Sequence, residues 1–209
     1  MADMAQIARA VEGGRRKVVD QLVREALAEG VKAETILNEG LVVGMTNLGE
    51  QFKNGEVYVP EVLVAARAMK TGTEILKPLL VAENVQSLGT VAIGTVEGDL
   101  HDIGKNLVGM MLEGSGFTVL DLGVDVKPEM FLDAVRGGAK IIGMSALLTT
   151  TMPMMAKVIE RLKDEGLRDQ VKVMIGGAPI TQEYADEIGA DGYSTDAASA
   201  AELAKRLIA

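Results

Sequence analysis

The chain has a single histidine, and its neighbours suggest what chemistry it could do. His101 lies in the segment Glu97-Gly-Asp-Leu-His-Asp-Ile-Gly104, two residues after Asp99. In an extended loop, side chains two residues apart can project to the same side, so the Asp99 carboxylate can accept a hydrogen bond from one imidazole nitrogen. The other nitrogen is then oriented as a metal ligand or as a base. Without further context, a lone histidine at a helix start is more often a polar turn residue.

Most sites that use a histidine need partners that this sequence lacks. A hydrolytic triad needs a nucleophile, but the chain has no cysteine and no nucleophile-elbow motif. An all-protein metal site needs further histidines or cysteines. One imidazole is sufficient, however, where a macrocycle already supplies the other bonds to the metal.

A phosphate-binding loop is the main rival interpretation of the same segment. Gly98, Gly104 and Lys105 resemble a Walker A motif, but five residues separate the two glycines instead of four. Asn106 stands where a serine or threonine binds magnesium in that motif. The first strand-like run is not followed by G-x-G-x-x-G, so a dinucleotide fingerprint is also missing. Nucleotide hydrolysis is therefore disfavoured.

Two regions of different periodicity must position this segment. Residues 4 to about 82 contain four amphipathic helical patterns with short joins, which predicts an up-and-down four-helix bundle. Between the third and fourth patterns, residues 51–60 are expected to form a loop whose apolar side chains either tuck into the bundle or cover a ligand. Residues 83–88 are polar and aperiodic. We place a linker there, within a first domain of residues 1–88.

From residue 89 to residue 209, strand-like and helical patterns alternate. The strand-like runs are 90–96, 118–122, 140–145, 171–175 and a weak run at 191–194. This alternation predicts a second domain with an α/β fold, a doubly wound five-stranded parallel sheet of Rossmann-like or flavodoxin-like type. With the flavodoxin-like strand order 2-1-3-4-5, strands one, three and four are adjacent, so the loops that follow them line one crevice.

The second and third of these loops allow two interpretations each. Ser145 is either an ordinary strand-end hydroxyl or a donor into the crevice. Gly176 and Gly177 suit a tight turn that needs positive φ, and they also let a bulky ligand lie against bare backbone.

Composition excludes several classes of partner. The net charge of −9 repels phosphate backbones, and with 3% aromatic residues and no tryptophan, stacking platforms for bases are missing. Nucleic acid is therefore not an expected partner. No apolar run reaches the roughly 18 to 20 residues of a membrane span, and the N-terminus lacks a signal-peptide pattern. The sequence thus predicts a cytoplasmic protein with no membrane partner, which the absence of cysteine fits.

Three separated motifs together resemble the signature of cobalamin-binding domains. They are Asp99-x-His101-x-x-Gly104, then Ser145-x-Leu147 about 40 residues later, then Gly176-Gly177 about 30 residues further on. The helical region, with residues 55–60 leading into a helix, is similar to the cap module that precedes this domain in methionine synthase and in the corrinoid proteins of methyltransferase systems. The resemblance covers nearly the whole chain.

The resemblance implies a role for individual residues. His101 would be the lower axial ligand to cobalt, Asp99 would hydrogen-bond it, and the hydroxyl of Thr151 would take part in a proton relay. Phe52 and Val59 match the cap positions that shield the upper face of the cofactor. The remaining cofactor-binding positions are Asp102, Ile103, Gly104, Ser145, Leu147, Thr149, Gly176 and Gly177.

The function implied by the resemblance is that of a methyl carrier, which is not a complete enzyme by itself. It would shuttle a methyl group on a corrinoid cofactor between a substrate-specific methyltransferase and a second methyltransferase acting on tetrahydrofolate or coenzyme M. A reductive activation protein is a further expected partner. The alternatives are a cobalamin-dependent sensor and the cobalamin subunit of a mutase. Against the sensor, the sequence shows no helix-turn-helix and no basic DNA-binding segment.

Overall fold

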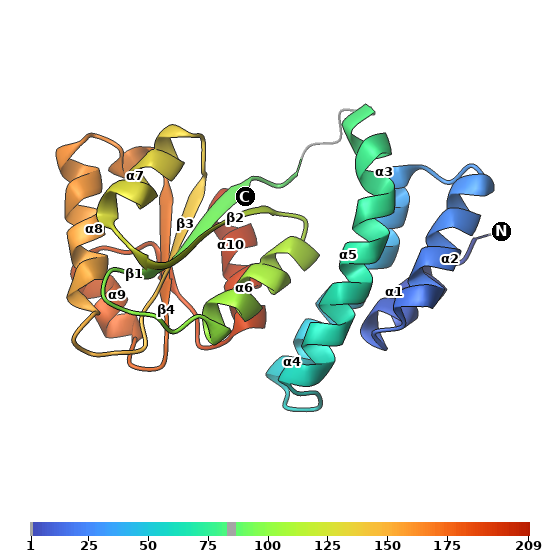
Figure 1. Ribbon diagram of the computed structural model, residues 1–209, viewed down its shortest axis with the longest axis horizontal. Coiled ribbons are helices and arrows are strands. Elements are labelled where there is room, and N and C mark those ends of the chain that lie inside the picture. Colours follow the sequence, from blue (N-terminus) through green and yellow to red (C-terminus); the bar gives the residue numbers. More distant parts are fainter. Residues whose placement is uncertain (1, 83–86) are drawn as a thin grey trace. The chain divides into compact units, whose positions relative to one another are not determined.

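The chain forms a helical unit followed by an α/β unit (Figure 1). The computed structural model describes residues 2–82 and 87–209. The helical unit runs to Ser87 and the α/β unit begins at Leu88. Most of the linker predicted at 83–88 lies outside the described residues.

The helical unit consists of four helical stretches, in agreement with the four patterns in the sequence. The third stretch is continuous, with a π-helical segment in its middle. The elements are α1 (Met4–Glu12), α2 (Arg16–Ala28), α3 (Ala33–Thr35), the π-helix η1 (Ile36–Val42), α4 (Val43–Lys53) and α5 (Val59–Ala82). The prediction of a helical N-terminal part is confirmed.

Small residues let these helices pack closely. A Cβ on Gly44 would lie 2.6 Å from the carbonyl oxygen of Ala8 and 2.8 Å from Cβ of Val11. Only glycine therefore permits the observed distance between α1 and α4. Ile7 and Leu41 are among the fully buried side chains of this unit.

The expected loop at residues 51–60 is shorter than predicted. Phe52 lies in the last turn of α4, and α5 already begins at Val59. The physical reason is that Phe52 follows Met45 and Leu48 at helical spacing, so it continues the apolar stripe of the helix. Phe52 and Val59 are half-buried, whereas Tyr58 is exposed.

The α/β unit is a doubly wound sheet. Its elements are β1 (Thr90–Val96), α6 (Ile103–Gly114), β2 (Thr118–Val126), α7 (Pro128–Arg136), β3 (Ile141–Ser145), α8 (Pro153–Asp164), the 3₁₀ turn η2 (Arg168–Gln170), β4 (Lys172–Gly176), α9 (Gln182–Ile188), β5 (Gly192–Tyr193) and α10 (Ala197–Ile208). All strand pairs are parallel, in the order β2-β1-β3-β4-β5. The predicted fold class is confirmed, and the strand order is the flavodoxin-like one considered in the sequence analysis. β2 extends four residues beyond the predicted run. The prediction stopped early because Gly123 and Asp125, both with positive φ, interrupt the strand pattern.

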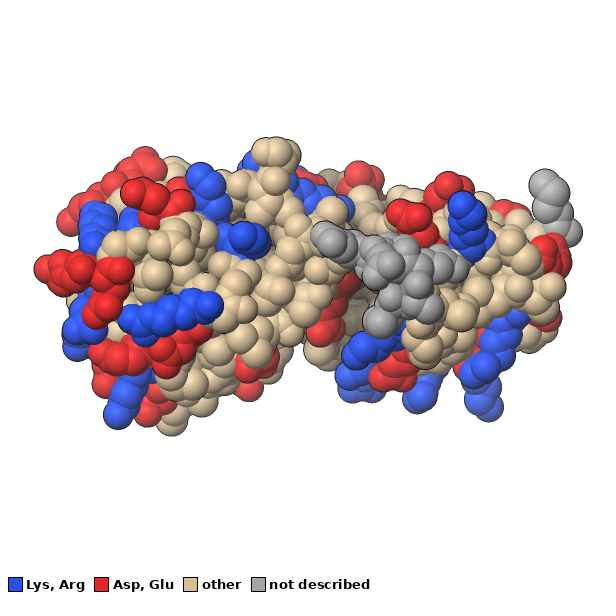
Figure 2. All heavy atoms as spheres, turned by 90° about the horizontal axis from the view of Figure 1, so that it is seen from above, with Lys and Arg blue, Asp and Glu red and all other residues tan. Residues whose placement is uncertain are grey.

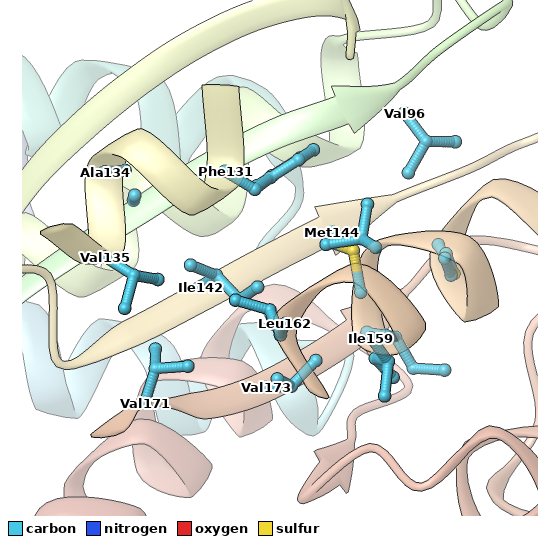
Figure 3. Close-up of a cluster of buried hydrophobic side chains, with 14 of the residues drawn as sticks. Val96, Phe131, Ala134, Val135, Ile142, Met144, Ile159, Leu162, Val171 and Val173 are labelled. Atoms are coloured by element: carbon cyan, nitrogen blue, oxygen red, sulfur yellow. The ribbon is translucent and has the colours of Figure 1, made fainter. Parts of the chain in front are cut away.

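Helices cover both faces of this sheet. Figure 1 shows α7, α8 and α9 on one face and α6 and α10 on the other. Figure 3 shows the first of these layers, in which Leu162 of α8 lies close to Ile142 of β3. The ring of Phe131 of α7 points toward β1, where a Cβ on Gly94 would lie 3.0 Å from it. All three side chains are fully buried, and each such burial stabilises the fold by about 1.5–3 kcal/mol. The core therefore fixes the strands, and the strands fix the loops at their carboxyl ends.

Surface charges of both signs are mixed on the face of the α/β unit seen in Figure 2. No helix among the described residues combines the length and the apolar character that a membrane span requires. The 24-residue helix α5 is long enough, but Arg67, Lys70 and Glu74 interrupt its apolar surface.

Candidate functional site

The loop after β1 folds back on the strand that it leaves. Gly98 adopts a φ of 84°, and the amide of Asp99 donates a hydrogen bond to the carbonyl of Val96 at 3.1 Å. Thr95, which is fully buried, donates its hydroxyl proton to the carbonyl oxygen of His101 at 2.9 Å. The main chain of His101 is therefore anchored to β1.

Asp99 and His101 form a pair. Nδ1 of His101 lies 2.7 Å from Oδ1 of Asp99, and the amide of His101 donates to the same oxygen at 3.0 Å. Asp99 is fully buried, whereas 52% of the His101 side chain is exposed. A carboxylate can only accept, so Nδ1 carries the proton and Nε2 of the neutral imidazole keeps its lone pair. This arrangement leaves Nε2 available to bind a metal.

The other oxygen of Asp99 binds the loop after β3. Oδ2 accepts hydrogen bonds from the amides of Leu147 and Leu148 at 2.8 and 3.2 Å, and from the hydroxyl of Thr151 at 2.9 Å. One buried carboxylate thus links two of the three loops singled out in the sequence. Sequence reasoning expected Leu147 and Thr151 at the cofactor, but it missed the amide of Leu148, which no residue type signals.

These hydrogen bonds decide the charge of Asp99. Burial alone raises the pKa of the carboxyl group, but the bonds from His101, Leu147 and Thr151 favour the ionised form and hold its pKa well below the usual range. Asp99 is therefore a carboxylate at neutral pH, and the proton shared with His101 resides on the imidazole.

The third loop lies against the second. The amide of Ala146 donates to the carbonyl of Gly176 at 3.2 Å, and Gly177, with a φ of 134°, faces the main chain of Ala146. Thr95, Ser145 and Gly176 are neighbours across the ends of β1, β3 and β4. The structure therefore brings the predicted residues of all three loops to one edge of the sheet.

Two glycines at this edge leave open space. Gly104 lies in the first turn of α6, and a Cβ built there meets nothing within 4 Å. A Cβ on Gly176 would have its nearest neighbour, the carbonyl oxygen of Ser194, at 3.8 Å. Glycine in a helix costs up to about 1 kcal/mol relative to alanine, and no internal contact of Gly104 requires it. The space at Gly104 is that expected for the close approach of a ligand.

Exposed apolar side chains flank His101 in the sequence, and others lie in the loop after β3 that Asp99 binds. Leu100 and Ile103 are 70% and 79% exposed, and Leu147 and Leu148 are 44% and 41% exposed. Exposed apolar groups that gather at one place mark a binding surface. A large ligand with an apolar face fits this surface.

The remaining predicted residues do not contact the Asp99–His101 pair in any bond described above. Asp102 is exposed and accepts a hydrogen bond from Asn106 at 3.0 Å, and Thr149 is exposed in the loop after β3. Phe52 and Val59 belong to the helical unit, and their role as a shield stays a prediction. Among the described residues, no group of three histidine, aspartate or glutamate side chains could hold a bare metal ion. The donor set is therefore suited to a metal that arrives with its own ligands.

Two protein-family models match this chain. A model described as a B12 binding domain matches residues 89–202, and a second model with the same description matches residues 4–77. The chain belongs to the B12-binding family. Its cofactor is a corrinoid, and the two matches fall in the α/β unit and the helical unit respectively.

Relatives of this B12-binding chain cover nearly its whole length. A corrinoid protein of Desulfitobacterium hafniense is 42% identical over 100% of this chain and 98% of its own length. The dimethylamine corrinoid protein 3 of Methanosarcina acetivorans is 46% identical over 97% of this chain and 95% of its own. A chain in the crystal structure of the methanol:cobalamin methyltransferase complex of Methanosarcina barkeri is 32% identical, with a TM-score of 0.84 over 97% of this chain and 78% of that chain.

Asp99→Asn is expected to destabilise this site. Five donor groups point at the carboxylate, and an amide nitrogen can accept from none of them. We expect the free energy of unfolding at pH 7, measured by urea denaturation, to fall by about 2–4 kcal/mol. Because the folded-state pKa is depressed, ionised Asp99 stabilises the fold above its unfolded pKa of about 3.9, and this stabilisation is lost as pH falls through the folded-state value. The difference in the free energy of unfolding between wild type and Asp99→Asn should therefore narrow below about pH 4.

Asp133→Asn is the matched control for this substitution. Asp133 is an exposed carboxylate that pairs with Arg136 on α7, so its replacement should change stability by no more than about 0.5 kcal/mol. Equal stability of Asp99→Asn and wild type at pH 7, or a gap that widens on acidification, would contradict the role assigned to the carboxylate.

Proposed function

We propose that this protein is the methyl carrier of a corrinoid-dependent methyltransferase system. It receives a methyl group from a substrate-specific methyltransferase and delivers it to a second methyltransferase that acts on tetrahydrofolate or coenzyme M. Relatives named as corrinoid proteins for dimethylamine and trimethylamine, and the likeness to a chain of a methanol:cobalamin methyltransferase complex, support the proposal. The observation that carries it is the Asp99–His101 pair, which leaves the second imidazole nitrogen free to bind a metal.

His101 supplies the protein ligand in this proposal. When bound, the corrinoid supplies a cobalt ion that takes up and gives back a methyl group. Asp99 holds Nδ1 of His101, so that Nε2, which faces away from the carboxylate, would be free to bind the cobalt. The remainder of the corrinoid would be held by Gly104, Ser145, Leu147, Gly176 and Gly177, together with Asp102, Ile103 and Thr149.

Asp99 also prepares the site for proton uptake. When Nε2 is not bound to metal it can take up a proton, and the resulting imidazolium charge is neutralised by the buried Asp99 carboxylate. The hydroxyl of Thr151 lies 2.9 Å from both Oδ2 of Asp99 and the carbonyl oxygen of Leu148. Because a hydroxyl has one proton, Thr151 donates to only one of them at a time. Thr151 can therefore adjust its bond to Asp99 as the charge of the pair changes.

Gly104→Ala tests the proposed approach of the cofactor to α6. Because the new methyl group meets no protein atom, we expect unchanged or slightly higher stability in urea denaturation. The same methyl group would occupy the space of the ligand, so cobalamin should bind about tenfold more weakly, equivalent to about 1.4 kcal/mol. Binding is measured by titrating the cofactor-free protein with cobalamin.

Gly109→Ala on the same helix is the control. Its Cβ would make an ordinary contact, 3.8 Å from Val119, on the side of α6 that packs on the sheet. We expect this variant to keep wild-type affinity. If both alanine variants bind cobalamin as wild type does, Gly104 does not face the cofactor.

The methyl-carrier proposal itself is tested by transfer. The protein is loaded with cobalamin, reduced, and incubated with isotope-labelled methyl donors and a panel of methyltransferases specific for methanol, methylamines, betaines or methoxylated aromatics. We expect one of these enzymes to place label on the protein-bound corrinoid, and a second methyltransferase to pass it to tetrahydrofolate or coenzyme M. A reductive activation protein should restore carriers that become oxidised. Cobalamin binding without transfer to or from any partner would favour a sensor.

A further inference from the structure

Strand β2 has an unusual backbone next to the His101 loop. Asp125 has a φ of 52°, and among the described residues it is the one amino acid other than glycine with positive φ. In the same stretch, the four residues from Ile93 to Val96 of β1 run beside the six residues from Asp121 to Val126 of β2. The extra residues form bulges, which proteins use to re-aim groups near functional sites.

Asp125 makes two hydrogen bonds to the His101 loop. Its Oδ1 accepts from the amide of Gly98 at 2.7 Å, and its own amide donates to the carbonyl of Asp99 at 3.0 Å. The first bond is charge-assisted, which makes it stronger than a neutral one. With its left-handed backbone, this one residue directs both its carboxylate and its amide to the same loop. The two bonds hold the main chain of Gly98 and Asp99 from both sides.

The same strand also holds the chain beyond His101. Oδ1 of Asp121 pairs with Nζ of Lys105 at 2.5 Å, and the Lys105 side chain is buried. Asp121 also accepts from the amide of Gly123 at 2.9 Å. β2 is therefore bonded to the loop before His101 through Asp125 and to the start of α6 through Asp121.

We propose that Asp125 is a positioning residue for the His101 ligand. By fixing the main chain at Asp99, it sets the place from which the Asp99 carboxylate reaches both Nδ1 of His101 and the amides of Leu147 and Leu148. Asp125 acts through Asp99 and not through contact with the cofactor. The inference rests on the proposed role of His101 as cobalt ligand.

Two variants separate the carboxylate acceptor from the backbone conformation. Asp125→Asn keeps a side-chain oxygen acceptor and a residue type that tolerates positive φ. Asp125→Gly adopts the same backbone without strain but has no acceptor for the amide of Gly98. We expect Asp125→Asn to resemble wild type, and Asp125→Gly to lose the fixed position of Asp99. Circular dichroism and urea denaturation show that each variant is folded.

The first measurement uses the cofactor-free protein. Because His101 is the only histidine, its ring nitrogens give one unambiguous set of ¹⁵N NMR signals. In wild type and Asp125→Asn, we expect shifts of a ring protonated on Nδ1. In Asp125→Gly, we expect averaged shifts from exchange between the two tautomers. The amide of Gly98 in wild type should also be protected from hydrogen exchange, a measurement that needs no variant.

The second measurement is cobalamin binding. We expect Asp125→Gly to bind roughly tenfold or more weakly, as is typical when a residue that orients a metal ligand is lost, and Asp125→Asn to stay within roughly twofold of wild type. The proposal is overturned if folded Asp125→Gly keeps the single tautomer and wild-type affinity, if Asp125→Asn loses both to the same extent, or if the Gly98 amide exchanges freely. If His101 is not the cobalt ligand, this is seen separately, in cobalamin-loaded wild-type protein. The tautomer result in the cofactor-free protein is then unchanged.

Discussion

His101→Ala is expected to abolish the bond between a protein nitrogen and cobalt in the loaded protein. No other histidine is present to replace the ligand. The side chain is half-exposed, and Asp99 keeps its three donors from the loop after β3, so we expect a loss of only about 1 kcal/mol in the free energy of unfolding. The variant should therefore fold and still contact the corrinoid through the other loops, with weaker affinity.

Electron paramagnetic resonance of the cobalt(II) form measures this bond directly. The cofactor's own base also carries nitrogen, so the protein is prepared with ¹⁵N-labelled histidine. If His101 is the ligand, the three-line nitrogen splitting of unlabelled wild type becomes a two-line splitting on labelling. Added imidazole should restore a nitrogen ligand to His101→Ala. A wild-type signal that does not respond to histidine labelling would falsify the assignment.

Gly177→Ala is expected to have the largest effect on stability. At a φ of 134°, an L-residue is strained, and a Cβ there would overlap the carbonyl oxygen of Ala146 and lie 2.9 Å from its carbonyl carbon. Since both groups belong to the main chain, neither can rotate away. Relief requires the loops after β3 and β4 to separate, which breaks the hydrogen bond from Ala146 to Gly176. We expect a loss of about 3–4 kcal/mol in urea denaturation of the cofactor-free protein.

Gly176→Ala, at the neighbouring position, is the control. Its φ lies outside the left-handed region, and the new Cβ would have an ordinary contact with the carbonyl of Ser194. We expect a stability change within about 1 kcal/mol, together with weaker cobalamin binding if the bare backbone faces the cofactor. Equal losses of stability in the two variants would show that the clash at Gly177 is not the cause of the destabilisation.

The sequence by itself determined the architecture of the α/β unit. Short apolar runs closed by polar loops predict β1, β3 and β4, because a strand covered by helices on both faces must be apolar along its length. Alternation with helical periods then requires parallel strands, and the strand order brings the loops at 97–104, 145–151 and 176–179 to one edge. A single histidine, with no second histidine and no cysteine, also led to the prediction that His101 supplies one bond to a metal that arrives already chelated. Local pattern was less reliable at element ends, where Phe52 continues a helix and β2 runs on through two bulges.

Only the tertiary structure decided how the site is held together. Asp99 accepts from the amides of Leu147 and Leu148, about 50 residues away, and every residue except proline has such an amide, so no residue type announces these bonds. The same holds for Asp125, whose bond to Gly98 depends on a left-handed backbone within a bulge. The glycines at 104 and 177 look alike in the sequence, yet one leaves open space and the other relieves a main-chain overlap. The spacing of residue types predicts which groups share an edge, whereas main-chain hydrogen bonds and steric clearance exist only in the folded chain.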